Sequence, residues 1–302
     1  MKIMKVKQIA IYMAIVVAVV SFSRCEKTED IVDFPVIPPA LVLNCYFSPD
    51  SIWSFKLSKS LSVIDNAELS FVLDAKIKLF EEWNLLTTIN NADFDGIYRY
   101  HGHSPIIGKE YQVEVQHPKF KTITSSDLLV NTGNGSVSAY RIIDSMTYYN
   151  PSDGKNYGTI DGNITLKIED QANTDNYYRV QMYYIDSFFG VKSKFMIRDI
   201  TSDNPAVDEN YYNGLLISDF FFDGKSYEIS FDFNDWDYST NKEYIISIES
   251  MSRARYLYEQ SYYLYLDRQG NPFAEPVMVY NNIVNGYGIF AGFVTTETKI
   301  TF

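Results

Sequence analysis

The stretch "ISDFFFDGKSYEISFDF", residues 217–233, decides the fold class, because it places strand signals on both sides of a turn signal. The pair Asp223–Gly224 favours the positive φ angles that a tight hairpin turn needs. After this pair, apolar and polar residues alternate with a period of two, and the apolar residues are Tyr227, Ile229, Phe231 and Phe233. Such alternation is typical of antiparallel strands with one buried and one solvated face. We therefore predict a short antiparallel hairpin here.

The same alternation recurs along the chain and sets the predicted architecture. Its apolar positions are Trp53, Phe55 and Leu57; Ala75, Ile77 and Leu79; Tyr111, Val113 and Val115; Ile164, Leu166 and Ile168. Further turns are predicted at Asp95–Gly96, Asp153–Gly154 and Asp161–Gly162. Because no regular helix separates these strands, we predict a mainly β protein of antiparallel, Ig-like β-sandwiches and not a parallel α/β fold.

One segment, residues 253–269, has helical spacing instead. Intervals of three and four residues place on one face Ala254, Leu257, Tyr258, Ser261 and Tyr265. Gly270 suits the C-terminal end of this helix, and Pro272 prevents its continuation. We predict a single helix near the C-terminus.

Asparagine and glycine interrupt the strand pattern at residues 131–135 and mark the predicted domain boundary. We expect an N-terminal β-sandwich over residues 37–130 and a C-terminal β-sandwich over residues 131–302 that carries the helix. Two domains suit a chain of 302 residues, at about 150 residues per domain.

The first 24 residues have the pattern of a signal peptide. Lys2, Lys5 and Lys7 give a positive start, and Ile9–Val20 is an uninterrupted apolar run. That run is shorter than the ~20 residues needed to span a bilayer, which favours a cleaved secretion signal over a transmembrane helix. We therefore expect an exported protein.

Cys25 is the predicted site of lipid attachment, directly after the signal peptide. Residues 25–39 are acidic and then proline-rich, so they suit a tether that reaches ~50 Å when extended. Cys45 is the only other cysteine, and it lies in a predicted core strand, which disfavours a disulfide. Arg24 departs from the small residue expected before a lipidated cysteine, and cleavage after Ser23 is the alternative.

Charge excludes one class of partner. The chain has 26 basic and 38 acidic residues and a net charge of −12, and removal of the signal peptide would delete basic residues and no acidic ones, which makes the net charge more negative. A surface of this sign repels phosphate backbones, so we predict no binding of nucleic acid.

No motif for catalysis or for a cofactor emerges from the residues. Histidine and aspartate form two weak metal-site candidates, namely His101 with His103, and Asp232, Asp235 and Asp237. The second set lacks the glycine and glutamate spacing of a helix–loop–helix calcium site, so a solvated acidic turn is the simpler interpretation. We expect no enzyme, no resident metal and no cofactor, while residues that are distant in sequence leave a glycan-acting enzyme as an alternative.

Aromatic residues make up 16% of the chain, and 25 of them are tyrosines. Neighbours in a strand point to opposite faces, so some members of aromatic pairs must be exposed. Exposed aromatic side chains are common at recognition surfaces. The predicted binding-surface residues are Tyr177, Tyr183, Phe221 and Tyr262.

The order of five motifs resembles one protein family. The motifs are "CEK", "LVLNCYFS", "GKEYQVEV", "NYYRV" and "EPVMVYNNIVNGYGIFAGF". Together they are similar to the Bacteroidota lipoproteins called domain of unknown function 4249, over nearly the whole mature chain. Arg24 and Cys45 depart from the family pattern.

The resemblance implies a lipoprotein of the outer membrane, exposed at the cell surface and associated with a TonB-dependent receptor. We therefore expect a non-enzymatic accessory or ligand-binding partner of such a transporter, held at the membrane by the lipid on Cys25. A structural or adhesive envelope protein is the alternative. The resemblance implies no catalytic residues.

Overall fold

A computed structural model describes residues 38–61, 68–130, 134–188, 191–211, 214–240, 242–271 and 273–302. Cys25 and the predicted signal peptide lie outside the described residues. The chain divides into two compact units, Met1–Pro38 and Pro39–Phe302, and the second unit is described here. Strands account for 58% and helices for 8% of the structure, which confirms the mainly β fold. Among the described residues, no helix has the length and apolarity to cross a membrane.

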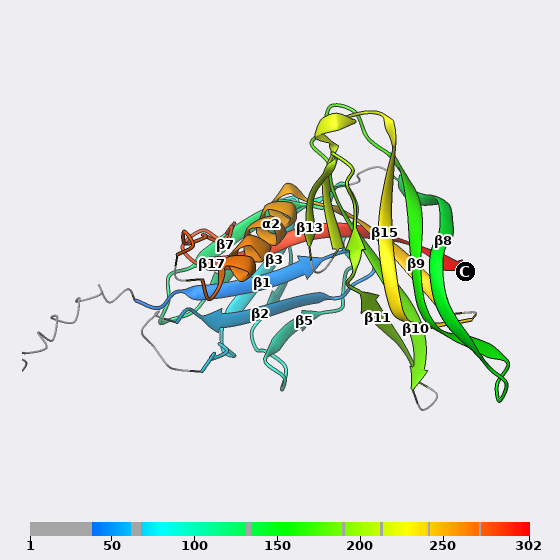
Figure 1. The fold of residues 1–302 in the computed structure, drawn as a ribbon. Coiled ribbons are helices and arrows are strands. Elements are labelled where there is room, and N and C mark those ends of the chain that lie inside the picture. The colour runs from blue at the N-terminus through cyan, green and yellow to red at the C-terminus, as the bar shows by residue number, and fades with distance from the viewer. Residues whose placement is uncertain are drawn as a thin grey trace, which may run out of the picture. The chain divides into compact units, whose positions relative to one another are not determined.

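The strands form three sheets (Figure 1). The nine-stranded sheet contains, in spatial order, β13 (Val207–Tyr211), β14 (Gly214–Ser218), β10 (Tyr177–Phe188), β16 (Glu243–Met251), β17 (Tyr287–Thr301), β1 (Leu41–Phe47), β2 (Trp53–Lys59) and β5 (Ile97–Tyr100), with β11 (Val191–Ile197) paired to β10. The β3–β6 sheet contains β4 (Asn84–Ile89), β3 (Lys76–Glu81), β6 (Glu110–Gln116) and β7 (Ile123–Leu128). The β9–β15 sheet contains β12 (Ile200–Thr201), β15 (Ser226–Ser239), β9 (Lys155–Glu169) and β8 (Asn134–Asn150).

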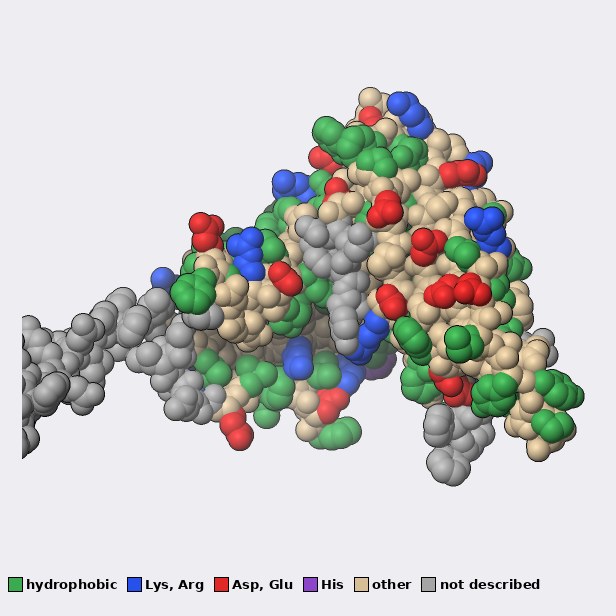
Figure 2. All heavy atoms as spheres, in the orientation of Figure 1, with side chains coloured by type: hydrophobic (Ala, Val, Ile, Leu, Met, Phe, Trp, Pro, Cys, Tyr) green, Lys and Arg blue, Asp and Glu red, His purple; other side chains and the backbone are tan. Residues whose placement is uncertain are grey.

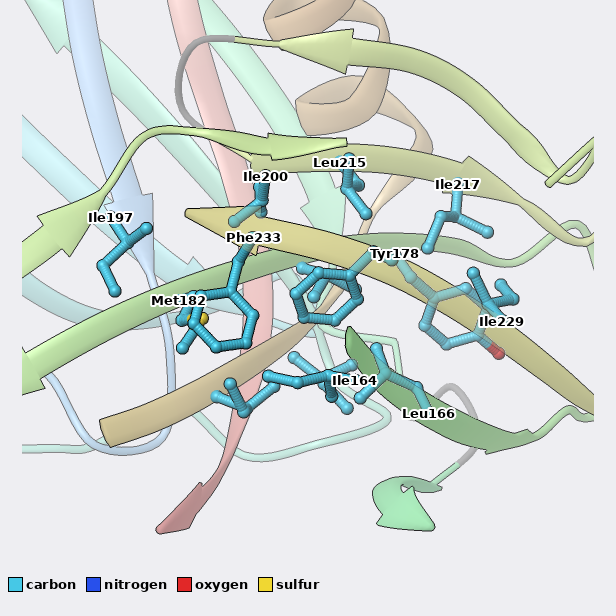
Figure 3. Packing of buried hydrophobic residues seen from close by; sticks show 14 of the residues in the cluster. Ile164, Leu166, Tyr178, Met182, Ile197, Ile200, Leu215, Ile217, Ile229 and Phe233 are labelled. Atoms are coloured by element: carbon cyan, nitrogen blue, oxygen red, sulfur yellow. The ribbon is translucent and has the colours of Figure 1, made fainter. Parts of the chain in front are cut away.

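Two hydrophobic cores lie between these sheets. One joins the β3–β6 sheet to β1, β2 and β17, and its largest side chains are those of Phe47, Trp53, Phe55, Tyr98, Tyr111 and Phe290. The other joins the β9–β15 sheet to β10, β14 and β16. Figure 3 shows this second core, where Ile164, Leu166 and Phe233 of one sheet face Tyr178 and Met182 of the other. Cys45 is buried in the first core, as predicted.

The last strand, β17, connects the two halves of the nine-stranded sheet. It pairs antiparallel with β16 and parallel with β1. The expectation of purely antiparallel pairing is wrong at this position. Gly288 allows the parallel contact, since it has a φ of 111° and a Cβ there would lie 2.0 Å from the carbonyl oxygen of Leu43. Because β17 joins strands from both sides of residues 130–131, the predicted domain boundary stays a prediction.

The stretch that indicated the fold class forms strands but not the predicted hairpin. The turn exists, with Gly224 at a φ of 68° after the short 3-10 helix η1 (Asp219–Phe221). However, β14 and β15 on its two sides belong to different sheets. Alternation of apolar and polar residues indicates which face of a strand is buried, but it does not indicate which strand pairs with it. The turn therefore passes the chain from one sheet to another.

The other predicted turns have mixed outcomes. Asp95–Gly96 and Asp153–Gly154 lie in turns, and both glycines have positive φ angles. The prediction of a turn at Asp161–Gly162 is wrong, because both residues lie inside β9. Gly162 instead makes room for the ring of Phe233, which lies 2.3 Å from the position that a Cβ would take.

The predicted helix is confirmed as α2, Arg253–Arg268. Ser252 caps its first turn by accepting a hydrogen bond from the backbone N–H of Arg255. The buried face of the helix is not the face that the helical spacing singled out, because its buried residues are Arg255, Tyr256, Glu259 and Tyr263. Two of these are charged, and they reach oppositely charged partners on the nine-stranded sheet, so a count of apolar spacing could not find this face.

Candidate functional site

The β8–β9 hairpin presents an edge strand to solvent. β8 is the terminal strand of the β9–β15 sheet, and among the described residues no strand pairs with its outer edge (Figure 1). Every side chain from Ser138 to Tyr149 is exposed. An edge strand offers free backbone N–H and C=O groups to a further strand.

The tip of this hairpin is held by its own hydrogen bonds. The backbone N–H of Gly154 donates to the carbonyl oxygen of Asn150 over 3.0 Å. Asp153 accepts hydrogen bonds from the backbone N–H of Lys155 and from the Tyr157 hydroxyl. The Tyr157 hydrogen bond lowers the pKa of the Asp153 carboxyl and raises that of the tyrosine. The hairpin is therefore a defined structural element.

Six large apolar side chains of β8 are exposed, and we call them the hairpin surface. They are Tyr140, Ile142, Ile143, Met146, Tyr148 and Tyr149. Met146 is 82% exposed and Tyr148 67%. In Figure 2, hydrophobic side chains gather at the lower right, where Figure 1 places the end of the hairpin. Because neighbours along a strand point to opposite faces, these side chains lie on both faces of β8. Large apolar side chains gathered on one exposed element are typical of interaction sites in soluble proteins.

A β-bulge shapes the middle of the hairpin surface. Ile142 pairs with Gly162 and Asp144 pairs with Asp161, so Ile143 is an extra residue without a partner on β9. Ile143 lines a hollow of about 370 Å³ together with the exposed Trp236 of β15. Bulges at sheet edges redirect side chains, and this one lies where an isoleucine and a tryptophan line the same hollow.

Comparison with known proteins places the chain in a family. A family model described as "Domain of unknown function (DUF4249)" matches residues 28–299. The chain belongs to this family. The expectation drawn from the five motifs is thus confirmed for the family itself.

Two other comparisons do not extend the assignment of the chain to the DUF4249 family. No curated protein matches it. Among solved structures, it is similar to the three N-terminal domains of the bacteriophage RB49 highly immunogenic outer capsid protein (Hoc), with 8% identity over 87% of this chain and 69% of that chain. The TM-score is 0.23, so the likeness carries no argument about fold or function.

Two of the three histidines of the DUF4249 chain have carboxylate partners. His103 lies 2.8 Å from Glu81, whose carboxylate also accepts a hydrogen bond from Tyr111. Burial opposes the charge of Glu81, but these hydrogen bonds outweigh burial and lower its pKa. His117 contacts Asp74, while His101 is exposed. Each of His103 and His117 is thus engaged by a carboxylate of its own.

The predicted acidic metal candidates point in different directions. Asp235 is buried and accepts hydrogen bonds from Lys242 and Tyr244. Asp232 and Asp237 are exposed. Asp235 is therefore part of a buried ion pair, and it does not join Asp232 in one coordinating face.

A different acidic cluster, which the sequence analysis missed, joins Asp170, Asp219 and Asp223. One carboxylate oxygen of each lies within 4.8 Å of the others. Burial raises the pKa of Asp219, although the backbone and side-chain N–H groups of Asn176 donate to its carboxylate. Asp170 lies in a different segment of the chain from Asp219 and Asp223, so no local motif could have predicted the cluster.

The predicted binding-surface aromatics do not form one patch with the hairpin surface. Tyr177 stacks on Tyr256 of α2, with ring centroids 4.4 Å apart. Tyr183 donates a hydrogen bond to Gln181 and lies beside Lys194. The remaining two are exposed, Phe221 against Phe220 and Tyr262 stacked on Tyr258. A role of these four residues in binding stays a prediction.

A buried ion network fixes α2 to the nine-stranded sheet. Glu249 of β16 accepts hydrogen bonds from Arg179 of β10 and from Arg255 of α2, and Arg179 also donates to Glu259 of α2. The Arg255 guanidinium also lies 3.8 Å from the ring centroid of Phe293. Burial lowers the pKa of Arg255, whereas for Arg179 the two glutamates outweigh burial and raise it. This network explains why charged residues occupy the buried face of the helix.

Proposed function

We propose that this chain is a non-enzymatic, lipid-anchored protein of the cell envelope that binds a partner protein through the β8–β9 hairpin. The observation that carries the proposal is the hairpin surface, a run of large apolar side chains on a strand whose outer edge pairs with no other strand in the described part of the chain. A partner that covers large apolar side chains stabilises the complex, by roughly 25 cal/mol per Å² of apolar surface buried.

The geometry suits recognition by strand addition. Beyond the bulge, Asp144–Asn150 runs in regular register with β9, which leaves one straight backbone edge. A partner strand would add hydrogen bonds along that edge, while Met146 and Tyr148 would pack against its side chains. The only charged side chains of β8 are those of Arg141 and Asp144, so few charges oppose such pairing.

We propose a TonB-dependent transporter of the outer membrane as the partner. The family resemblance supports this choice, and lipid on Cys25 would hold the protein at the membrane surface beside such a barrel. The described core begins after the predicted tether, so the tether would set how far the hairpin reaches from the lipid.

We also propose that the two cores correspond to two Ig-like sandwich domains, over residues 37–130 and 131–302, with β17 as a strand common to both. Two separate hydrophobic cores support this division. In that arrangement the C-terminal domain presents the hairpin, and the N-terminal domain lies next to the tether in the sequence.

Co-purification from membranes in mild detergent tests the proposal. We expect the full chain to retain a transporter barrel, and the double variant Met146→Lys/Tyr148→Lys to lose it. The matched control is Phe273→Lys/Met278→Lys, since both residues are over 90% exposed and lie outside the hairpin. Retention of the barrel by the hairpin variant, or its absence from the wild-type preparation, contradicts the proposal.

A further inference from the structure

A groove on the outer face of the β3–β6 sheet, a different sheet from that of the hairpin surface, combines an exposed tryptophan with apolar and polar side chains. Across the sheet, Leu85, Phe80, Gln112 and Ser126 follow one another in register on neighbouring strands. Trp83 lies in the turn between β3 and β4 and lines the groove, whose volume is about 490 Å³. Small-molecule sites typically have about 300–1,000 Å³.

The groove holds a buried donor without a partner. Gln112 is only 5% exposed, and its Oε1 accepts a hydrogen bond from the backbone N–H of Trp83 over 3.0 Å. That bond fixes the orientation of the amide and leaves Nε2 with no hydrogen-bond partner among the described residues. An unsatisfied buried donor is costly, so a ligand oxygen that reaches Nε2 gains a hydrogen bond that the protein itself does not supply.

The turn that carries the tryptophan is held in an unusual conformation. Glu82 and Trp83 have φ angles of 49° and 67°. This left-handed pair suits a two-residue hairpin turn, but asparagine and glycine are the residues that adopt it at low cost. Trp83 remains 75% exposed. The turn thus holds a large aromatic face in solvent beside Gln112.

The electrostatics of the groove favour an uncharged ligand. Glu114, the charged residue that lines it, forms an ion pair of 2.7 Å with Lys78. The other lining groups are apolar, hydroxyl or amide side chains. Val284 is 58% exposed and adds apolar surface at one end.

We propose that this groove binds a neutral glycan through a pyranose ring stacked on Trp83. One face of such a ring presents C–H groups that pack on the electron-rich face of an indole. A ring hydroxyl would accept from Gln112 Nε2, and others would exchange hydrogen bonds with Ser126 and Glu114. The inference goes beyond the proposed docking function, because it uses another sheet and does not require a protein partner.

Calorimetric titration of the full chain with neutral hexasaccharides of glucose, mannose and xylose tests the site, and a sialylated trisaccharide serves as the charged comparison. We expect at least one neutral probe to bind with a Kd of about 1 mM or tighter, and the charged probe to bind more weakly. Trp83→Ala should weaken binding at least tenfold. Trp236→Ala is the matched control, since Trp236 is also 75% exposed but lies on another sheet.

Two further variants keep the outcome clear. Gln112→Leu removes the unpartnered donor, and we expect it to weaken binding of the same probe. Met146→Lys/Tyr148→Lys should leave sugar binding unchanged, which separates this site from the docking function. Failure of all three neutral probes to bind, or equal affinity of the wild type and Trp83→Ala, overturns the proposal.

Discussion

Removing the charge of Glu249 should destabilise the fold strongly. Its carboxylate lies 2.6 Å from Arg179 and 3.0 Å from Arg255, and all three side chains are nearly buried. Glu249→Gln leaves two buried guanidinium groups with one carboxylate, that of Glu259. Breaking a buried ion pair by removal of one partner costs about 3–5 kcal/mol. We expect a loss of that size in the free energy of unfolding.

Urea unfolding followed by tryptophan fluorescence measures this loss. The control is Glu243→Gln, because Glu243 pairs with Lys299 at an exposed position, where its loss should leave the unfolding midpoint unchanged. A second comparison replaces the network with apolar residues, as Arg179→Met, Glu249→Leu, Arg255→Met and Glu259→Leu together. Apolar replacement of a whole buried ion network is often neutral or stabilising, so this variant should be more stable than Glu249→Gln.

The result that refutes this reasoning is specific. If Glu249→Gln lowers the free energy of unfolding by less than about 1 kcal/mol, the guanidinium groups are solvated and do not clamp α2 to the sheet. If the apolar variant is less stable than Glu249→Gln, the packing of these side chains, and not the charge imbalance, determines the loss of stability.

Three other predictions follow from the structure and sequence. Gly288→Ala should cost about 3 kcal/mol of stability, measured by urea unfolding, because its Cβ would meet the carbonyl oxygen of Leu43 in the parallel pair; an unchanged midpoint contradicts this. Burial raises the pKa of the Asp127 carboxyl to about 6, although the backbone N–H of Gly292 donates a hydrogen bond to it. The folded protein therefore binds more protons than the unfolded chain, and its free energy of unfolding falls by at most about 3 kcal/mol as the pH rises from 4 to 7. Urea unfolding across this pH range should show a smaller fall for Asp127→Asn, and an equal fall for variant and wild type would refute the assignment. Cys25→Ser should move the protein from the membrane to the soluble fraction, and identical fractionation of variant and wild type would argue against lipidation.

The sequence predicted which segments are strands better than which strands are neighbours. Alternating apolar residues located β2, β3, β6, β9 and β15, because burial of one face leaves a period of two. The pairing of β17 with β1 depends on contacts almost 250 positions apart, and no local pattern encodes it. The separation of β14 from β15 by a turn typical of hairpins has the same cause.

The candidate site was missed for a related reason. β8 lacks alternation because both of its faces are exposed from Ser138 to Tyr149, so a search for half-buried strands passes over it. The available signal was the Asp153–Gly154 turn directly after a segment that holds Tyr140, Tyr148 and Tyr149. Likewise, the buried face of α2 escaped prediction because Arg255 and Glu259 are buried as ion pairs and not as apolar residues.

Photo-crosslinking in intact cells tests the central claim, which is that the hairpin surface contacts a partner protein. A photoreactive amino acid replaces Tyr148 in one strain and Met278 in another, since both positions are exposed but only Tyr148 belongs to the hairpin surface. We predict an adduct with an outer-membrane transporter barrel from position 148 and none from position 278. No adduct from position 148, or the same adducts from both positions, would contradict the account.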